Sequence, residues 1–454
     1  MIANSLCWPV MTDSTFTEEL TTQATATASP ITGKARIQSI DTLRGVALLG
    51  ILLLNIIAFA NPFAAYMDPR VDGATAGIDL ATFMTMDIFF EGSMRAIFSM
   101  LFGAGLLIFM AKPNTDPEYV KGLFYRRTLL LVAFGLFNAY VLVWAGDILY
   151  GYGMAGLILF FFRDYSAKKL ATCSFIVLAL LTIMHTGLQY NIRTLKSAAD
   201  AVAALPTGTE LSEEQQSAVD SWNGFLETQS MTPELIQEEL EAKEAGYVTN
   251  FIATAKANVF IQTIAFVTFA LWDVLAMMLL GMAFWKWGLF DASRSLGVYA
   301  TMLLLGFGIG IPLNYWETLT YVNSGFEPHW IANMRPTYDI GRLSLAMGYI
   351  GLVMVICKIG VLGAVRNALA KVGQMALTNY LSQSLICNVI FMGFGFGLAG
   401  ELARHQIYYV VLGVWIFQLI TSSIWLRHYR FGPAEWLWRS LTYKKTQALK
   451  LETA

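Results

Sequence analysis

The sequence predicts an all-α protein that crosses a membrane several times. Of its 454 residues, 56% are hydrophobic and 14% are charged, whereas soluble domains average about 45–50% and about 25%. The apolar residues gather in stretches of about 18–25, which as helices span a hydrocarbon layer of about 30 Å. We therefore expect an all-α polytopic membrane protein whose constant partners are membrane lipids. The 30 basic and 32 acidic residues nearly balance, which leaves no long basic face for nucleic acid.

Hydropathy predicts about ten transmembrane helices. The first 35 residues are rich in Thr, Ser and Ala and contain no continuous apolar run, so we expect a disordered tail rather than a signal peptide. A second short tail is predicted at 444–454. The predicted spans are residues 43–61, 93–111, 128–145, 148–162, 170–189, 259–283, 296–314, 340–361, 373–397 and 406–426.

One long polar segment divides the spans into two groups of five. Residues 36–189 are expected to form an N-terminal bundle and residues 259–443 a C-terminal one. The segment between them, 190–258, is predicted to form helices outside the bilayer, because its acids recur at helical spacing. These acids are Glu234, Glu238, Glu239, Glu241 and Glu244.

The positive charges predict the orientation. With the ten spans above, 21 of the 30 Lys and Arg fall on the side of the N-terminus, 8 on the other side, and Arg95 within a span. Lys and Arg near span ends are retained in the cytoplasm. We expect both termini in the cytoplasm and the acidic insertion outside it.

Charges inside or beside spans head the list of candidate functional residues, since such charges are costly in lipid. Asp87, Glu91 and Arg95 are four residues apart, which predicts one helix face carrying either a polar site open to the outer side or an ion-pair ladder. Asp273 lies in the middle of the sixth span. It is expected to face the bundle interior and bond a polar group of another span.

The first span carries two further candidates. Arg44 lies at its cytoplasmic end and Asn55 about 16 Å deeper, near the bilayer midplane. Arg44 suits a membrane anchor or a phosphate ligand. A midplane amide needs an interhelical hydrogen bond or a ligand. A cavity reaching from the cytoplasmic rim past Asn55, and lined by Asn379 or Gln383, would make this span part of a binding site.

Two later segments are polar for their position. Asn379, Tyr380 and Gln383 share a helix face, which indicates helix–helix hydrogen bonding or the lining of a cavity. After the tenth span, Arg430 and Arg439 stand among Trp residues, a composition typical of the membrane interface. The same arginines are suited to holding a phosphate group of a cytosolic ligand.

Several kinds of site are not indicated. The four cysteines are far apart and no Cys/His pair has zinc-ligand spacing, so we predict neither a disulfide framework nor a metal site. The sequence contains no Walker A loop, dinucleotide glycine fingerprint, HExxH or GxSxG motif. Glycines in the second span, such as Gly103, are expected to permit close helix packing. No histidine is identified as a general base.

Five strings resemble the YeiB-like bacterial membrane proteins with a C-terminal domain of unknown function 418. The resemblance runs from about residue 36 to 443 and implies an inner-membrane protein. The strings are Asp41-Thr-Leu-Arg44-Gly45-Val-Ala-Leu-Leu-Gly50-Ile-Leu-Leu-Leu-Asn55, Phe98-Ser-Met-Leu-Phe-Gly103-Ala-Gly105, Asp147-Ile-Leu-Tyr150-Gly151-Tyr-Gly153, Leu377-Thr-Asn379-Tyr380-Leu-Ser-Gln383-Ser384 and Phe431-Gly-Pro-Ala-Glu435-Trp436-Leu-Trp438-Arg439.

The first string is also similar to the first helix of transmembrane acyltransferases, including the heparan-glucosaminide N-acetyltransferase-like group. That resemblance implies an acyl-CoA donor bound from the cytoplasm and an acceptor on the other side. In this hypothesis Arg44 holds phosphate, Asn55 orients the thioester or stabilises the oxyanion, and Asp87 or Glu91 supplies the general base. The alternatives are a proton-coupled transporter of a small metabolite or lipid, which would use Asp273 and Asp87, and a membrane sensor or assembly partner.

Overall fold

The computed structural model describes residues 36–111, 116–206, 208–228 and 232–451. The described residues contain no β-strand, and the predicted N-terminal tail lies outside them. Seven helical segments are long and apolar enough to cross a membrane, so the all-α polytopic class is confirmed. These segments are residues 38–60, 77–110, 167–203, 247–286, 296–323, 336–359 and 404–428.

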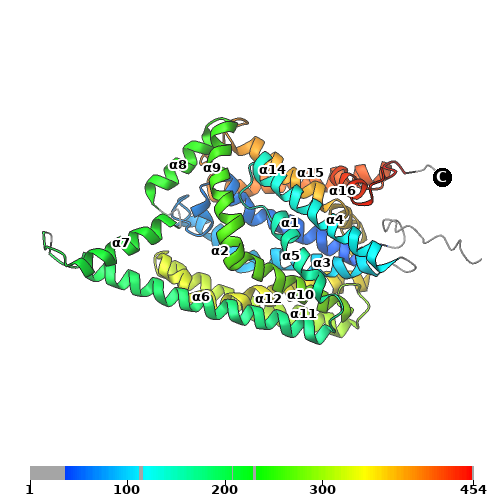
Figure 1. Ribbon diagram of the computed structural model, residues 1–454, viewed down its shortest axis with the longest axis horizontal. Coiled ribbons are helices and arrows are strands. Elements are labelled where there is room, and N and C mark those ends of the chain that lie inside the picture. Colours follow the sequence, from blue (N-terminus) through cyan, green and yellow to red (C-terminus); the bar gives the residue numbers. More distant parts are fainter. Residues whose placement is uncertain (1–35, 112–115, 207, 229–231, 452–454) are drawn as a thin grey trace, which may run out of the picture.

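Helices account for almost all of the ordered chain (Figure 1). They are α1 (Gln38–Ala60), α2 (Gly77–Phe90), α3 (Ser93–Met110), α4 (Pro117–Leu136), α5 (Leu149–Leu159), α6 (Ala167–Ala203), α7 (Glu213–Thr228), α8 (Pro233–Glu244), α9 (Tyr247–Phe260), α10 (Leu271–Lys286), α11 (Leu296–Asn323), α12 (Pro328–Ile359), α13 (Gly363–Gln374), α14 (Ala376–Phe391), α15 (Arg404–His428) and α16 (Pro433–Tyr443). Two π-helical segments, η3 (Phe137–Val141) and η5 (Ile261–Ala270), extend α4 and join α9 to α10.

The centre of the bundle is built from both predicted halves. Helix α1 is buried along nearly its whole length and packs on α3, α13, α14 and α15. Helix α3 packs on α10 so closely that a Cβ on Gly103 would come within 2.0 Å of the Met278 carbonyl oxygen. A Cβ on Gly281 would likewise meet the Met100 oxygen at 1.9 Å. Small residues therefore set the α3–α10 spacing, as expected for Gly103.

The acidic insertion is helical, as predicted, but its helices are continuous with the neighbouring spans. Helix α6 runs on to Ala203, beyond the predicted end at 189, and the helix of the sixth span already begins at Tyr247. Helices α6 and α7 project from one end of the bundle, at the left of Figure 1, while α16 lies at the other end. Lys243 ties the insertion to the bundle, because its Nζ donates to the carbonyl oxygens of Ala58 and Asn61 at the end of α1.

Two predicted spans have different boundaries in the structure. The segment predicted at 373–397 is broken at Met375, so that α13 and α14 are separate helices and α14 has 16 residues. The segment predicted at 128–145 begins at Pro117, because α4 continues through its basic first turns. The start of α14 follows from a contact with α16 that is described below, whereas α4 begins where the Asp116 side chain caps it by accepting a hydrogen bond from the Glu118 N–H. The count of ten spans stays a prediction for these shorter helices.

Candidate functional site

Two cavities enter the bundle from opposite ends of α3. The first has a volume of about 280 Å³ and lies between α1, α3, α4, α5, α14 and α16. Its interior is apolar and its outer end is basic. It is lined mainly by Arg36, Ile37, Ile40, Asp41, Arg44, Phe98, Leu101, Phe102, Gly105, Leu106, Phe109, Phe124, Arg127, Leu131, Leu149, Tyr152, Leu377, Tyr380, Glu435, Trp438, Arg439 and Tyr443.

The start of α1 places two arginines on one carboxylate at the basic end. Arg36 Nε donates to Asp41 Oδ2 at 2.8 Å, and Arg44 Nη1 donates to Asp41 Oδ1 at 3.0 Å. Asp41 is 4% exposed, whereas the two guanidinium groups reach the cavity. One carboxylate therefore neutralises only one of two arginines, and positive charge is left at the cavity entrance.

Helix α16 adds a third arginine and α4 a fourth. The guanidinium of Arg127 lies 3.7 Å from the ring centre of Trp438, and Trp438 Nε1 donates to the Arg127 carbonyl oxygen at 2.8 Å. Burial and then the charge of Arg36 lower the pKa of Arg439 to about 10. Arg439 is thus still protonated at neutral pH, but its charge is poorly compensated, which favours an anionic ligand.

Glu435 explains why α14 begins where it does. Its Oε1 accepts hydrogen bonds from the backbone N–H groups of Leu377 at 2.7 Å and Thr378 at 3.0 Å, and its Oε2 accepts from Thr378 Oγ1 at 2.6 Å. A carboxylate that satisfies the first free N–H groups of a helix stabilises a helix start at that point. Glu435 is therefore fixed at the start of α14, and its single charge offsets only part of the charge of Arg44 and Arg439 nearby.

The inner end of the first cavity is closed by two tyrosines. Tyr380 Oη accepts a hydrogen bond from the Ile148 N–H at 3.1 Å, which holds α14 against the start of α5. Tyr152 Oη is 2.5 Å from Ser99 Oγ and donates to the Arg95 carbonyl oxygen at 3.3 Å. The backbone of Arg95 thus contacts the floor of the first cavity, while its side chain lines the second.

The second cavity has a volume of about 240 Å³ and opens near the loop that follows α1. Unlike the first, it is lined mostly by polar and aromatic side chains. The two cavities open toward opposite ends of α1, the first beside Arg36 and Arg44 and the second beside Tyr66 and Met67. The lining residues are Tyr66, Met67, Phe83, Asp87, Glu91, Arg95, Asn314, Glu317, Tyr321, Tyr338 and Arg342.

The predicted single helix face of Asp87, Glu91 and Arg95 is wrong, although all three line this cavity. Helix α2 ends at Phe90 and α3 begins at Ser93, with Gly92 between them at φ 66°. Glu91 accepts hydrogen bonds from Tyr66 at 2.8 Å and Tyr338 at 3.0 Å, so it forms no ion-pair ladder. Asp87 Oδ2 accepts from Thr318 Oγ1 at 2.6 Å.

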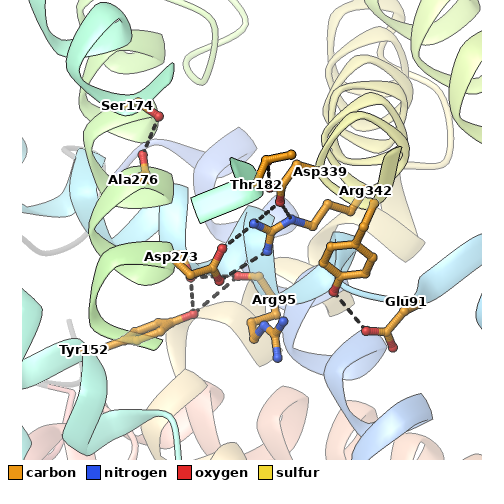
Figure 2. Close-up of polar contacts among 11 residues, drawn as sticks. Glu91, Arg95, Tyr152, Ser174, Thr182, Asp273, Ala276, Asp339 and Arg342 are labelled. Carbon is orange, nitrogen blue, oxygen red and sulfur yellow. Dashed lines mark hydrogen bonds and ion pairs between the residues drawn. The ribbon is translucent and has the colours of Figure 1, made fainter. Parts of the chain in front are cut away.

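Asp273 has the interhelical partner that the sequence required, which confirms that prediction. Arg342 of α12 pairs with Asp273 through both terminal nitrogens and with Asp339 through Nε at 2.8 Å (Figure 2). Thr182 of α6 donates to the other oxygen of Asp339 at 3.0 Å. The guanidinium of Arg342 is thus shared by two carboxylates and joins α6, α10 and α12.

Besides Asp273, four predicted site residues line neither cavity. Asn55 is half-buried and makes no side-chain hydrogen bond to the described residues. Asn379 Nδ2 donates to Ser422 Oγ at 2.9 Å, and Gln383 Nε2 donates to Gln418 Oε1 at 3.1 Å. These amides therefore join α14 to α15, which is the helix–helix role expected for them. Arg430 contributes to neither cavity, in contrast to Arg439.

Sequence reasoning missed several residues that the structure brings together. The sequence does not single out Arg127, Glu435 or Tyr152 as candidate site residues. A signal existed for Arg342, since it falls inside the predicted span 340–361, where it is the natural partner for an intramembrane acid. Tyr66 and Tyr338 gave no signal, because their roles depend on the fold alone.

Comparisons with known proteins agree with this architecture. Residues 284–445 match the family model described as "Protein of unknown function (DUF418)". The chain is 30% identical over 422 residues to "Uncharacterized protein YeiB" of Escherichia coli K12, covering 89% of this chain and 96% of that one. It is 26% identical to "Uncharacterized protein YxaH" of Bacillus subtilis 168, covering 93% and 98%. No solved structure gives a significant match. The chain therefore belongs to the YeiB-like family of membrane proteins, whose C-terminal part is the DUF418 domain.

Proposed function

We propose that the protein is a transmembrane acyltransferase with a cytoplasmic acyl-CoA as its donor. The observation that carries the proposal is the first cavity, an apolar chamber whose entrance is surrounded by Arg36, Arg44, Arg127 and Arg439. Phosphate groups of coenzyme A would pair with these arginines, and the acyl chain would lie against Phe102 and its neighbours.

The depth of this cavity suits such a donor. Its lining runs along α3 from Phe109 to Phe98, about 16 Å at 1.5 Å per residue. In the proposed complex the thioester reaches Tyr152 while the nucleotide stays at the entrance. The hydroxyl group of Tyr152 would then donate a hydrogen bond to the carbonyl oxygen.

The acceptor would come from the second cavity, which begins at Arg95, one helical turn beyond Phe98. Its nucleophile attacks the thioester carbonyl carbon, its proton passes to the carboxylate of Asp87 or Glu91, and coenzyme A leaves as the thiolate. For the two substrates to meet, Tyr152 has to turn away from Ser99. Asn55 lies in neither cavity, and we give it no part in donor binding.

Calorimetry on the purified protein in nanodiscs tests donor binding. Acetyl-CoA and a longer acyl-CoA should bind, and release of free thiol should be detectable with a thiol-reactive dye when a suitable acceptor is added. Absence of binding to monodisperse, cooperatively melting protein would contradict the proposal. Binding that is unchanged in both Arg44→Gln and Arg439→Gln would also contradict it.

The proposed location is a bacterial inner membrane with both termini in the cytoplasm. The excess of basic residues at the end of the bundle that carries α16 supports this orientation. A cysteine introduced at the exposed Glu238 should react with an impermeant maleimide in intact spheroplasts, whereas one at Lys444 should react only after lysis. The reverse pattern would show that the orientation is inverted.

A proton-coupled transporter is a second candidate, favoured by one observation. The two cavities approach each other from opposite sides and are separated by about one turn of α3, with the Asp273–Arg342 pair beside the barrier. Alternating opening toward the two sides would make one pathway of them. Proteoliposomes carrying a pH-sensitive dye would show proton movement driven by a substrate gradient if this candidate is correct.

A further inference from the structure

One arginine of the second cavity, Arg95, has acids near it but is not bound directly by any of them in the part of the chain that the structure describes. The Arg95 side chain is exposed to the cavity and forms neither a hydrogen bond nor an ion pair with the residues that the structure describes. In Figure 2 no dashed line reaches its guanidinium. A guanidinium within a spanning segment is costly unless something compensates it. Glu91 and Asp273 compensate this charge through space, and a ligand with an anionic oxygen pair would add the bidentate contact that the described residues do not make.

Other charged groups of the cavity are already engaged. Arg342 is held between Asp273 and Asp339, and both oxygens of Glu91 accept hydrogen bonds from tyrosines. Asp87 uses only Oδ2, in its bond from Thr318. Arg95 and the second oxygen of Asp87 are thus the charged atoms on these residues that remain for a ligand.

The charges of the residues that line the cavity restrict the kind of ligand that can bind there. Asp87, Glu91 and Glu317 all line the cavity, whereas Arg95 is its one basic lining residue besides the already paired Arg342. A simple anion would be attracted by Arg95 and repelled by the acids. A simple cation would be attracted by the acids and repelled by Arg95. A molecule that carries both charges satisfies the two kinds of group together.

The size of the cavity restricts the ligand further. Drug-sized ligands occupy pockets of about 300–1,000 Å³, and this cavity measures about 240 Å³. The first cavity is only slightly larger, but the nucleotide of the ligand proposed for it stays at the entrance, whereas a ligand enclosed in the second cavity has to fit its volume. Tyr66, Tyr321 and Tyr338 line it with rings that leave little room for a long chain. These limits favour a ligand of amino-acid size.

We propose that the second cavity binds a small zwitterion, whose carboxylate pairs with Arg95 and whose ammonium group faces Asp87 and Glu91. The role of this ligand as an acyl acceptor rests on the proposed function. The binding of the ligand does not, because it needs no acyl donor. Failure of acyl-CoA binding and failure of zwitterion binding are therefore separate results.

A set of small probes tests the charge requirement on the purified wild-type protein in nanodiscs. The zwitterions glycine, β-alanine and 4-aminobutyrate differ in the separation of their charges, while butyrate and butylamine each keep one of the two charges. At equal concentration, at least one zwitterion should raise the melting temperature and give a calorimetric binding signal, and butyrate and butylamine should give neither. Equal binding of butyrate would indicate a plain anion site, equal binding of butylamine a cation site, and either result overturns the proposal. So does the absence of binding by all three zwitterions.

Variants locate the binding in the cavity. Arg95→Gln should weaken the zwitterion about tenfold or more, because it removes a charge-assisted bidentate contact. The zwitterion affinity of Arg95→Lys should lie between those of Arg95→Gln and the wild type, since lysine keeps the charge but lacks the planar guanidinium that binds a carboxylate bidentately. Arg70→Gln removes an arginine that pairs with Asp68 outside the cavity and should bind like the wild type. If Arg95→Gln does not fold, the set of probes on the wild-type protein still tests whether the cavity requires a zwitterion. Wild-type affinity in a folded Arg95→Gln protein would overturn the assignment to Arg95.

Discussion

The two cavities share α3, but their charged groups lie in different places. At the first, the charges stand at the entrance, where Arg36 and Arg44 share Asp41 and leave an excess of positive charge over an apolar interior. At the second, charged groups line the interior itself. Glu91 accepts hydrogen bonds from Tyr66 and Tyr338, Asp87 accepts one from Thr318, and Arg342 is paired with Asp273.

The difference indicates two kinds of ligand. An apolar interior with a basic entrance suits an amphiphile with an anionic head group, which keeps its charge at the membrane surface. A polar interior at the end of a spanning helix suits a small ligand that is enclosed completely. The four predictions below test this contrast, beginning with the largest expected effect.

Removing Arg342, the lining residue of the second cavity that two carboxylates share, should have the largest effect on stability. Arg342→Gln leaves the buried carboxylates of Asp273 and Asp339 without their partner, which costs about 3–5 kcal/mol when a buried pair is broken. A thermal melt in detergent should show a large loss of folded protein. The matched control is Arg70→Gln, whose guanidinium is 41% exposed. Equal melting of the two variants would show that the triad does not support the bundle.

Removing arginines from the entrance of the first cavity should affect ligand binding more than protein stability. Arg44→Gln leaves Asp41 paired with Arg36, so no carboxylate loses its last partner. We expect Arg44→Gln and Arg439→Gln each to weaken acyl-CoA about tenfold, equivalent to about 1.4 kcal/mol, with little change in melting temperature. Arg430→Gln, which lies outside the cavity, should bind normally. A loss in Arg430→Gln as large as in Arg439→Gln would mean that binding depends only on net charge.

A substitution in the turn between α2 and α3 should affect ligand binding in the second cavity but not in the first. Gly92 has φ 66°, and a Cβ there would come within 2.6 Å of Tyr338 Oη. Gly92→Ala should cost about 1–2 kcal/mol and displace Tyr338 from Glu91, which reduces zwitterion binding and leaves acyl-CoA binding intact. Gly122→Ala, in an α4 position with open space around it, should be neutral. Loss of both ligands in Gly92→Ala would show that the cavities are not independent.

The smallest effect is expected for the amide contacts outside both cavities. Asn379→Ala removes the hydrogen bond to Ser422 between α14 and α15, and such contacts in membrane proteins average about 0.6 kcal/mol. We expect a slight fall in melting temperature and unchanged acyl-CoA binding. Thr421→Ala, which removes a hydroxyl that bonds only within α15, is the control. A large loss of acyl-CoA binding in Asn379→Ala would place this amide in the donor site after all.

The functional residues were accessible to sequence reasoning to different degrees. Arg44, Arg95 and Asp273 were found because charge in or beside an apolar run is conspicuous. The helix break at Gly92 was missed, because regular four-residue spacing from Asp87 to Arg95 imitates a continuous helix. Tyr66 and Tyr338 are ordinary aromatic residues in the sequence, and only the packing of three separate segments gives them Glu91 as a common partner.

By itself the sequence determined the fold class and most of the helices, because lipid requires long apolar stretches and these are visible along the chain. It also determined that Asp273 needs a partner. The tertiary structure decided which partner this is and that α14 begins at Ala376, where Glu435, 59 residues later in the chain, accepts hydrogen bonds from its first N–H groups. It further decided that the Arg95 side chain faces a cavity. These outcomes depend on side chains far apart in the sequence, whose contacts no local pattern records.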